Sequence, residues 1–330
     1  MSDRAEWLAA RRSGIGGSDV AALIGLSPYL TQYQLWLEKT GRGAPDTHDE
    51  AAIERMHFGA VLEGVVSAEF VRRREATVQR VNTPLQHPEC SIAIANIDRA
   101  VVQPGSRARW DDKAGRLLGA TAVLECKTAH ALAGRSEEWG EPGTADVPVH
   151  YWLQCQWYLG ITGLPVAHLA CLFGGQRFAI YDIEFSAADF AQLLERADRW
   201  WRAHVVADTP PDPASEAEAR ERWPRHAAGK TQIVDAGIAS AVEHLRSVKA
   251  QIAELEEAEE RWRDIILPAF GDAEAITHGG RVLATWKSSK DSTTTDWKAI
   301  VAELTPAPEV ITRHTVERPG VRRFVLKETK

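Results

Sequence analysis

The order of apolar patterns along this chain predicts an α/β (α+β) fold with a helical extension. A helical apolar repeat over 50–75 is followed by a β-like stretch over 76–126. A Trp- and Gln-rich helix over 147–163 then precedes two more strands and another helix. After a segment rich in Pro, Ala and charge, a long 3/4 apolar repeat begins at Ile238. The first group of elements predicts a sheet with helices, and the last predicts a separate helical part.

The first 45 residues read as short helices separated by glycine turns. A helical segment is expected over 7–12, and Ser18 or Asp19 can cap a second helix over 20–24. A third helix is expected over 31–39. The later expected elements are strands over 91–97, 121–126, 167–173 and 177–185 and a helix over 187–206.

Composition shifts suggest three parts. We expect a first domain over 1–212, a linker over 213–230 and a C-terminal part over 231–330. The C-terminal part is expected to be a helical hairpin or coiled coil followed by a small β-rich element. Glu259 interrupts its apolar repeat, whose packing within the chain or between copies stays open. The repeat consists of Ile238, Ala241, Leu245, Val248, Ile252, Leu255, Trp262 and Ile266.

Charge and cysteine content exclude several classes of protein. The 330 residues include 39 Lys and Arg against 46 Asp and Glu, a net charge of −7, which disfavours a protein that coats nucleic acid non-specifically. The four cysteines lack the spacing of a zinc site, so we expect reduced thiols. No apolar run reaches the roughly 20 residues of a membrane span, and no signal peptide is expected.

The chemistry is expected where two apolar strands end. Asp98 follows one strand, and Glu125-Cys126-Lys127 ends the next. Because strand side chains alternate between faces, Glu125 and Lys127 point the same way and Cys126 points the other way. If the strands pair, two carboxylates and an ammonium meet at one end of a sheet. Such carboxylates can hold Mg²⁺, and the lysine can stabilise negative charge or position a water.

An acid followed by Glu-x-Lys is by itself a weak signal, since charges at strand ends are commonly solvated. Three further residues make an ordered set. Glu63 lies on the preceding helix, and Gln154 and Tyr158 lie one turn apart on one face of the following helix.

These residues give the chain a resemblance to a known family over about residues 5–212. The chain resembles the YqaJ-like viral recombinases of the lambda-exonuclease type, within the PD-(D/E)xK nuclease superfamily. The segments that carry the resemblance, beside the acidic set, are Trp7, RRSGIGGSD over 11–19, GLSPY over 25–29, QLWLEKTG over 34–41, YWLQCQWYLGITG over 151–163, and Trp200 with Pro210-Pro211. The resemblance implies a restriction-endonuclease-like core, a central mixed sheet flanked by helices.

The resemblance also implies roles for single residues. Asp98, Glu125, the Cys126 main-chain carbonyl and Glu63 would bind the metal, and Lys127 would act on the nucleophilic water. Gln154 and Tyr158 would orient the ligands or contact DNA.

The N-terminal residues would grip a 5′-phosphate. Arg11 and Ser18 are the positions implied, with Arg12 as an alternative to Arg11, since a guanidinium pairs with phosphate oxygens. The chain departs from the superfamily pattern at Ile97, where Pro is usual, and at Arg99, where Gly is usual. Arg99 could crowd the metal or contact a phosphate.

The function implied is a Mg²⁺-dependent exonuclease that digests linear double-stranded DNA 5′→3′ and leaves 3′ single strands. Two metal ions are expected, with Mn²⁺ as a substitute for Mg²⁺. The expected partners are DNA ends, a single-strand annealing protein and further copies of the chain as a trimer, in the cytoplasm of a bacterial host. Two alternatives stay open: a structure-specific endonuclease or nickase of the same fold, and a non-catalytic DNA-end-binding module.

Overall fold

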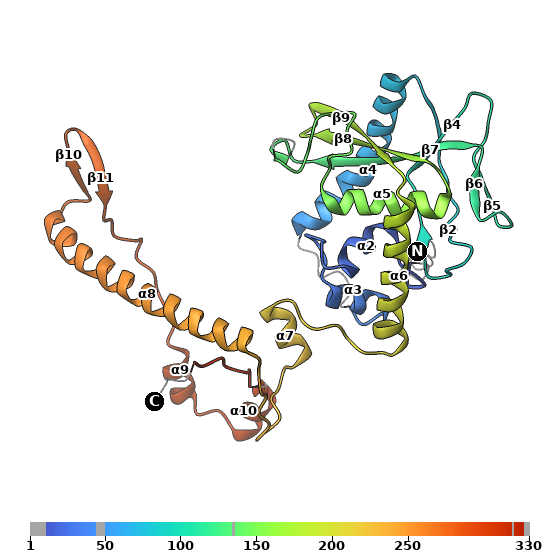
Figure 1. Cartoon of the computed structure of the whole chain (residues 1–330). Helices are drawn as coiled ribbons and strands as arrows, with labels where there is room; N and C mark the ends of the chain where they lie inside the picture. The colour runs from blue at the N-terminus through green and yellow to red at the C-terminus, as the bar shows by residue number, and fades with distance from the viewer. Residues whose placement is uncertain (1–10, 44–49, 134–135, 319, 327–330) are drawn as a thin grey trace. The chain divides into compact units, whose positions relative to one another are not determined.

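The structure is a computed structural model, which describes residues 11–43, 50–133, 136–318 and 320–326 (Figure 1). The chain divides into two compact units, residues 1–222 and 223–330. Residues 7–10 of the first expected helical segment, including Trp7, lie outside the described ranges.

A five-stranded mixed sheet forms the centre of the first unit. The strand order is β1-β4-β7-β8-β9, in which β7 and β8 are parallel and the other neighbours are antiparallel. The strands are β1 (Thr77–Gln79), β4 (Arg99–Val102), β7 (Ala120–Ala129), β8 (Val166–Phe173) and β9 (Arg177–Glu184). The predicted fold class is therefore confirmed, because helices cover both faces of this sheet.

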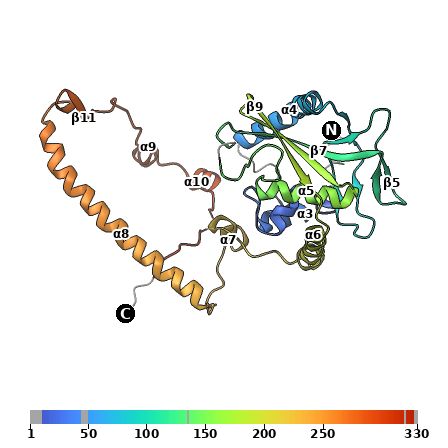
Figure 2. The ribbon, with the colours of Figure 1, turned by 45° about the horizontal axis from the view of Figure 1, so that its top comes forward.

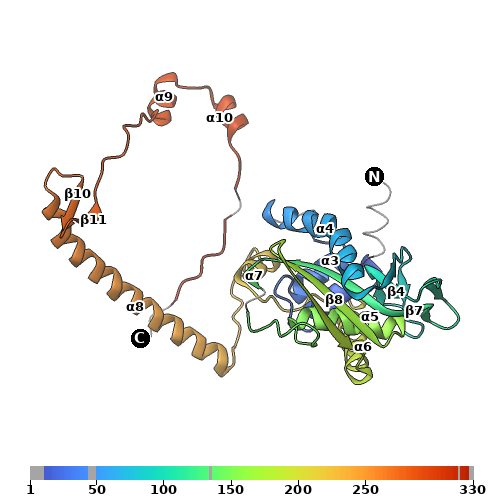
Figure 3. The same cartoon turned by 90° about the horizontal axis from the view of Figure 1, so that it is seen from above.

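Helix α4 (Glu50–Arg74) covers one face of the sheet (Figure 3). Val66 and Phe70 of α4 are buried against Leu124 of β7. The N-terminal half of α4 is different, since Phe58, which the apolar repeat places on the buried face, is half exposed. The C-terminal half of α4 alone anchors the helix.

Helix α5 (Val149–Thr162) covers the opposite face together with α6 (Ala187–Trp200) (Figure 2). Trp157 of α5 is fully buried, and its indole nitrogen donates to the carbonyl of Ile94 at 3.0 Å. Gly163 ends α5 in the left-handed region at φ 69°, a conformation that favours glycine. The larger hydrophobic core lies on this side of the sheet.

Two short helices, α2 (Gly17–Leu23) and α3 (Gln32–Lys39), precede α4. The expected cap of α2 is wrong, because the helix begins earlier and Gly16 is its N-cap residue. Asp19 is the third residue of the helix and accepts from the Gly16 amide at 2.8 Å. The cap of α3 is Thr31, which accepts from the Gln34 amide as a hydroxyl N-cap does.

The strand expected over 91–97 is wrong as a neighbour of β7. Only β3 (Ile94–Ala95) forms there, and it pairs with β2 (Leu85–Gln86) outside the main sheet. The strand beside β7 is β4, which begins after Asp98. Alternate residues of 91–97 are buried as an apolar strand requires, but burial does not specify which strand is the hydrogen-bonding neighbour.

Other departures concern the elements that connect these layers. Strands β5 (Arg109–Asp111) and β6 (Arg116–Leu118) form a hairpin in the loop between the catalytic strands. Helix α6 continues as a π-helical turn over Trp201–Val206. Helix α7 (Glu216–Arg222) forms inside the segment expected as a linker, and Glu218 accepts from the Thr31 hydroxyl at 2.7 Å.

The second unit is built on one long helix, α8 (Ala236–Ile266), drawn in orange in Figure 1. A helical hairpin or a coiled coil was expected here. Because α8 is unbroken, it is compatible with a coiled coil and not with a hairpin inside this segment. The other elements are a 3₁₀ turn over Leu267–Phe270, β10 (Ala275–His278), β11 (Arg281–Thr285), α9 (Trp297–Leu304) and α10 (Pro308–His314). Among the described helices none is long and apolar enough to span a membrane.

The contact between α5 and α6 gives a test of the packing. A Cβ added to Gly160 of α5 would lie 2.2 Å from the ring of Phe190, which is buried on α6. Gly160→Ala is therefore expected to lower the free energy of unfolding by about 1–3 kcal/mol, through overpacking. Urea denaturation measures this change.

The matched control is Gly64→Ala on α4, where an added Cβ meets no atom within 4 Å among the described residues. That variant is expected to gain up to about 1 kcal/mol from helix propensity. Equal stability of the two variants would contradict the close packing of α5 on α6.

Candidate nuclease site

Glu125 and Lys127 lie on the α5 side of β7. Their neighbours Leu124 and Cys126 pack in the smaller core under α4, so the alternation along the strand is the one expected. Lys127 Nζ lies 2.7 Å from Glu125 Oε1, and Glu125 is only 3% exposed. A buried carboxylate is thus paired with an ammonium two residues away on the same strand.

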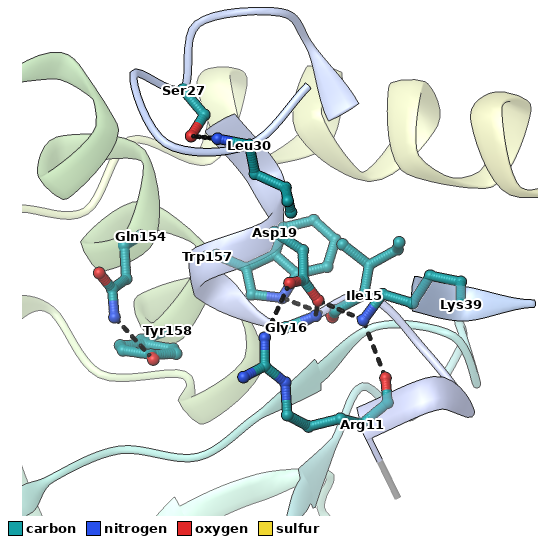
Figure 4. Close-up of polar contacts among 10 residues, drawn as sticks. All are labelled: Arg11, Ile15, Gly16, Asp19, Ser27, Leu30, Lys39, Gln154, Trp157 and Tyr158. Carbon is teal, nitrogen blue, oxygen red and sulfur yellow. Dashed lines mark hydrogen bonds and ion pairs between the residues drawn. The ribbon is translucent and has the colours of Figure 1, made fainter. Parts of the chain in front are cut away.

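Gln154 and Tyr158 of α5 complete this group from the helix above the strand. Gln154 Nε2 donates to Glu125 Oε1 at 2.8 Å and lies 2.9 Å from the Tyr158 hydroxyl. Figure 4 shows the two side chains beside each other on consecutive turns of α5. The contact fixes the orientation of the Glu125 carboxylate, because one of its oxygens receives both the lysine and the amide.

Asp98 reaches the same place from the adjacent strand. It stands immediately before β4, and its Oδ2 accepts from the Cys126 amide at 2.8 Å. The amide and the carbonyl of one strand residue point to the same side, so the Cys126 carbonyl lies on the side of Asp98. Strand β4 pairs with β7 only as far as Leu124, which leaves this part of the β7 edge to Asp98.

Glu63 approaches from α4 on the other side of the sheet. It forms an ion pair with Arg99, whose guanidinium also donates to the Asp98 carbonyl at 2.6 Å. Arg99 therefore turns toward Glu63. This ion pair holds the Glu63 carboxylate, and among the described residues no three His, Cys, Asp or Glu side chains are arranged as a metal cluster.

The electrostatics of the buried acids nevertheless suit a divalent cation. Burial, and next the charge of Glu125, raise the pKa of Asp98 to about 7. Glu125 Oε2 is buried and has no hydrogen-bond partner among the described residues. Burial opposes the charge on Lys127, but Glu125 outweighs it and raises the Lys127 pKa. One ammonium thus lies near two carboxylates, and the Glu125 oxygen without a partner suits a Mg²⁺ ligand.

The N-terminal residues form a second polar group beside α2 (Figure 4). Asp19 binds the Arg11 guanidinium at 3.3 Å and the Lys39 ammonium at 2.5 Å, and both Asp19 and Lys39 are buried. Lys39 also donates to the Arg11 carbonyl at 2.8 Å. Ser18 is exposed in the first turn of α2, and Arg12 is exposed near Gly41. Of the three residues expected to bind phosphate, Arg11 is the one held by the buried residues Asp19 and Lys39.

An aromatic group beside Lys127 was not expected. The Lys127 ammonium lies 5.1 Å from the centre of the Tyr151 ring, a cation–π distance. His150 lies next to Tyr151, and exposed Tyr29 meets His150 edge-on at 5.5 Å. The signal was present in the helical spacing, since Tyr151 is one turn before Gln154 on the same face of α5.

Comparison with known proteins places the chain in a family. The model of the YqaJ-like viral recombinase domain matches residues 6–165. The YqaJ protein of Bacillus subtilis (strain 168) is 31% identical over 334 residues, which cover 98% of this chain and 94% of that protein. The chain belongs to the YqaJ family. Membership confirms the predicted family and the predicted class of enzyme, a deoxyribonuclease.

Solved structures similar to this YqaJ-family chain include two exonucleases. The alkaline exonuclease LHK-Exo from Laribacter hongkongensis is 18% identical, covers 66% of this chain and 97% of its own, and has a TM-score of 0.44. A phage-related exonuclease from Haemophilus somnus 129PT is 9% identical, covers 59% of this chain and 96% of its own, and has a TM-score of 0.38.

The buried pair of Asp19 and Lys39 gives a test of the N-terminal group. Lys39→Met leaves the Asp19 carboxylate buried with less compensating charge, so we expect about 3 kcal/mol lower stability in urea denaturation. Adding Asp19→Asn removes the uncompensated charge and keeps an acceptor for the Gly16 amide. The double variant should therefore recover at least about 1 kcal/mol. A double variant less stable than Lys39→Met would contradict a charge-paired interior.

Proposed function

We propose that this chain is a Mg²⁺-dependent exonuclease that digests double-stranded DNA from its ends in the 5′→3′ direction and leaves 3′ single strands. The observation that carries the proposal is that Asp98, directly before β4, binds the Cys126 amide between Glu125 and Lys127 of β7, while Gln154 fixes one oxygen of Glu125. Direction and product follow from the family resemblance, and the geometry supports the hydrolytic site.

Asp98, Glu125 and the Cys126 carbonyl would hold the metal, and Glu63 would join them if Arg99 releases it. Mg²⁺ favours such hard oxygen ligands and keeps several waters, so two carboxylates and a carbonyl suffice on the protein side. When bound, the metal supplies Lewis-acid stabilisation of the phosphate charge and a more acidic water. Two ions, and Mn²⁺ as a substitute, are part of the proposal.

The protein side chains prepare the site for an anionic reaction centre. Lys127 keeps its positive charge beside Glu125 and can stabilise negative charge that develops on the phosphate. Tyr151 lies against the lysine and restricts where the ammonium can go. Gln154, which also contacts the Tyr158 hydroxyl, donates to Glu125 and restrains its carboxylate, which lowers the reorganisation needed when substrate binds.

Arg11 and Ser18 would bind the 5′-phosphate of the strand being digested. Asp19 and Lys39 hold the Arg11 guanidinium and the Arg11 carbonyl, which supports a fixed position for this residue. Arg12 stays the alternative. The remaining proposed partners are a single-strand annealing protein and further copies of the chain as a trimer, in the cytoplasm of a bacterial host.

The catalytic assignment is tested by Glu125→Gln. The variant keeps the shape of the side chain and loses a ligand charge, so digestion of linear duplex in Mg²⁺ should slow by about 100-fold or more. Calorimetry should show weaker Mn²⁺ binding by the same variant. Lys127→Met should slow digestion similarly while Mn²⁺ still binds.

The control for this test is Glu184→Gln at the end of β9, an exposed acid whose loss should change neither digestion nor Mn²⁺ binding. Wild-type rates in Glu125→Gln would show that the site lies elsewhere. Absence of Mn²⁺ binding in the wild type would favour a non-catalytic end-binding module. Cutting of covalently closed circular DNA would favour an endonuclease.

The phosphate assignment is tested with duplexes that differ only in the 5′-phosphate. The wild type should digest the phosphorylated end faster, and Arg11→Ala should lose that preference because one bidentate contact disappears. Arg12→Ala is the matched comparison and should keep the preference. If Arg12→Ala loses the preference and Arg11→Ala keeps it, the phosphate contact belongs to Arg12. If the wild type digests both ends at the same rate, neither arginine has a phosphate role.

A further inference from the structure

Helix α8 carries an apolar stripe along its length. The stripe repeats at alternating steps of three and four residues, and Leu255 and Trp262 on it are 69% and 65% exposed. Its described members, defined here as the α8 stripe, are Ile238, Ala241, Leu245, Val248, Ile252, Leu255, Trp262 and Ile266, with Glu259 at the one polar step. Exposure of so many large apolar side chains on one helix indicates an interaction surface.

The spacing identifies the kind of partner. A strict seven-residue repeat fits a second helix in a left-handed coiled coil, in which the two helices share one seam. The partner must also match the length of α8, which has 31 residues. Helices α9 and α10 have 8 and 7 residues and are too short to cover it. In α4 only the N-terminal half is free of the sheet, and this half is also too short. A second α8 meets both requirements.

We propose that two copies of this chain associate through their α8 stripes as an antiparallel coiled coil. Glu259 decides the orientation. A parallel pair in register would place the two Glu259 carboxylates opposite each other in the seam, where like charges repel. An antiparallel pair separates them, because each Glu259 then faces Val248 of the other copy.

The antiparallel register also fits the rest of the stripe. With its centre between Ala253 and Glu254, Ile252 faces Leu255 of the second copy, and Leu245 faces Trp262. Each of these layers is apolar on both sides. Glu259 remains close to Arg263 of its own helix, at 3.4 Å, which compensates its charge in the seam.

Charges beside the stripe favour the same orientation. In the antiparallel register Lys249 of each copy flanks Glu256 of the other, which gives two opposite-charge pairs per dimer. Neither residue takes part in an ion pair within the described chain, so both are available for the contact. In the parallel register Lys249 instead meets His244, which offers no negative charge.

The association is tested on the full-length chain by light scattering after size exclusion. Leu245→Asp/Leu255→Asp should lower the number of chains per particle, because the contact between two copies of α8 is lost. The control is Ala250→Asp/Ala253→Asp on the outward face of α8, which carries the same charges and should keep the wild-type mass. A mass unaffected by the stripe variant would overturn the proposal, since the stripe would then be covered by its own chain.

The orientation is tested by reversing charge. Lys249→Glu should weaken the association by about tenfold, because two attractive pairs become repulsive, and Lys249→Glu/Glu256→Lys should restore it. In a parallel pair Lys249→Glu would instead leave the association unchanged or strengthen it, because the new carboxylate would face His244. That result would overturn the antiparallel arrangement. Nuclease rates do not enter either test, so the result is independent of the function proposed above.

Discussion

The site depends on one buried contact, the carboxylate of Glu125 with the ammonium of Lys127 and the amide of Gln154. A buried carboxylate costs free energy unless it is charge-paired and hydrogen-bonded, and here one oxygen receives both contacts while the other has none among the described residues. The contact ties the central strand to α5. It also leaves Glu125 Oε2 without a hydrogen-bond partner among the described residues, so the same interaction bears on both the fold and the proposed chemistry.

The sheet positions this contact because alternate residues of β7 point to opposite faces. Leu124 and Cys126 pack under α4, whereas Glu125 and Lys127 point to α5. Asp98 joins them because β4 stops pairing with β7 at Leu124, which frees the Cys126 amide for the Asp98 carboxylate. The usual residue after such an aspartate is glycine, and Arg99 in its place pairs with Glu63 on the α4 side. The arginine thus holds a carboxylate that could otherwise join the proposed metal ligands.

The two units of the chain differ in what their residues do. The first is closed around two cores and holds every residue of the proposed hydrolytic and phosphate-binding groups. The second exposes an apolar stripe, and the spacing of this stripe fits a partner helix.

Helical and strand periodicities and short motifs are local properties, so they were enough to predict the main helices and the family and to nominate the residues of the acidic set. Alternation alone placed Glu125 and Lys127 on one face, and helical spacing alone placed Gln154 beside Tyr158. Tertiary structure decided which strand borders β7, that Glu63 is held by Arg99, and that Tyr151 covers Lys127. These depend on contacts between residues distant in the chain, and an apolar or charged side chain does not encode which distant partner it will meet.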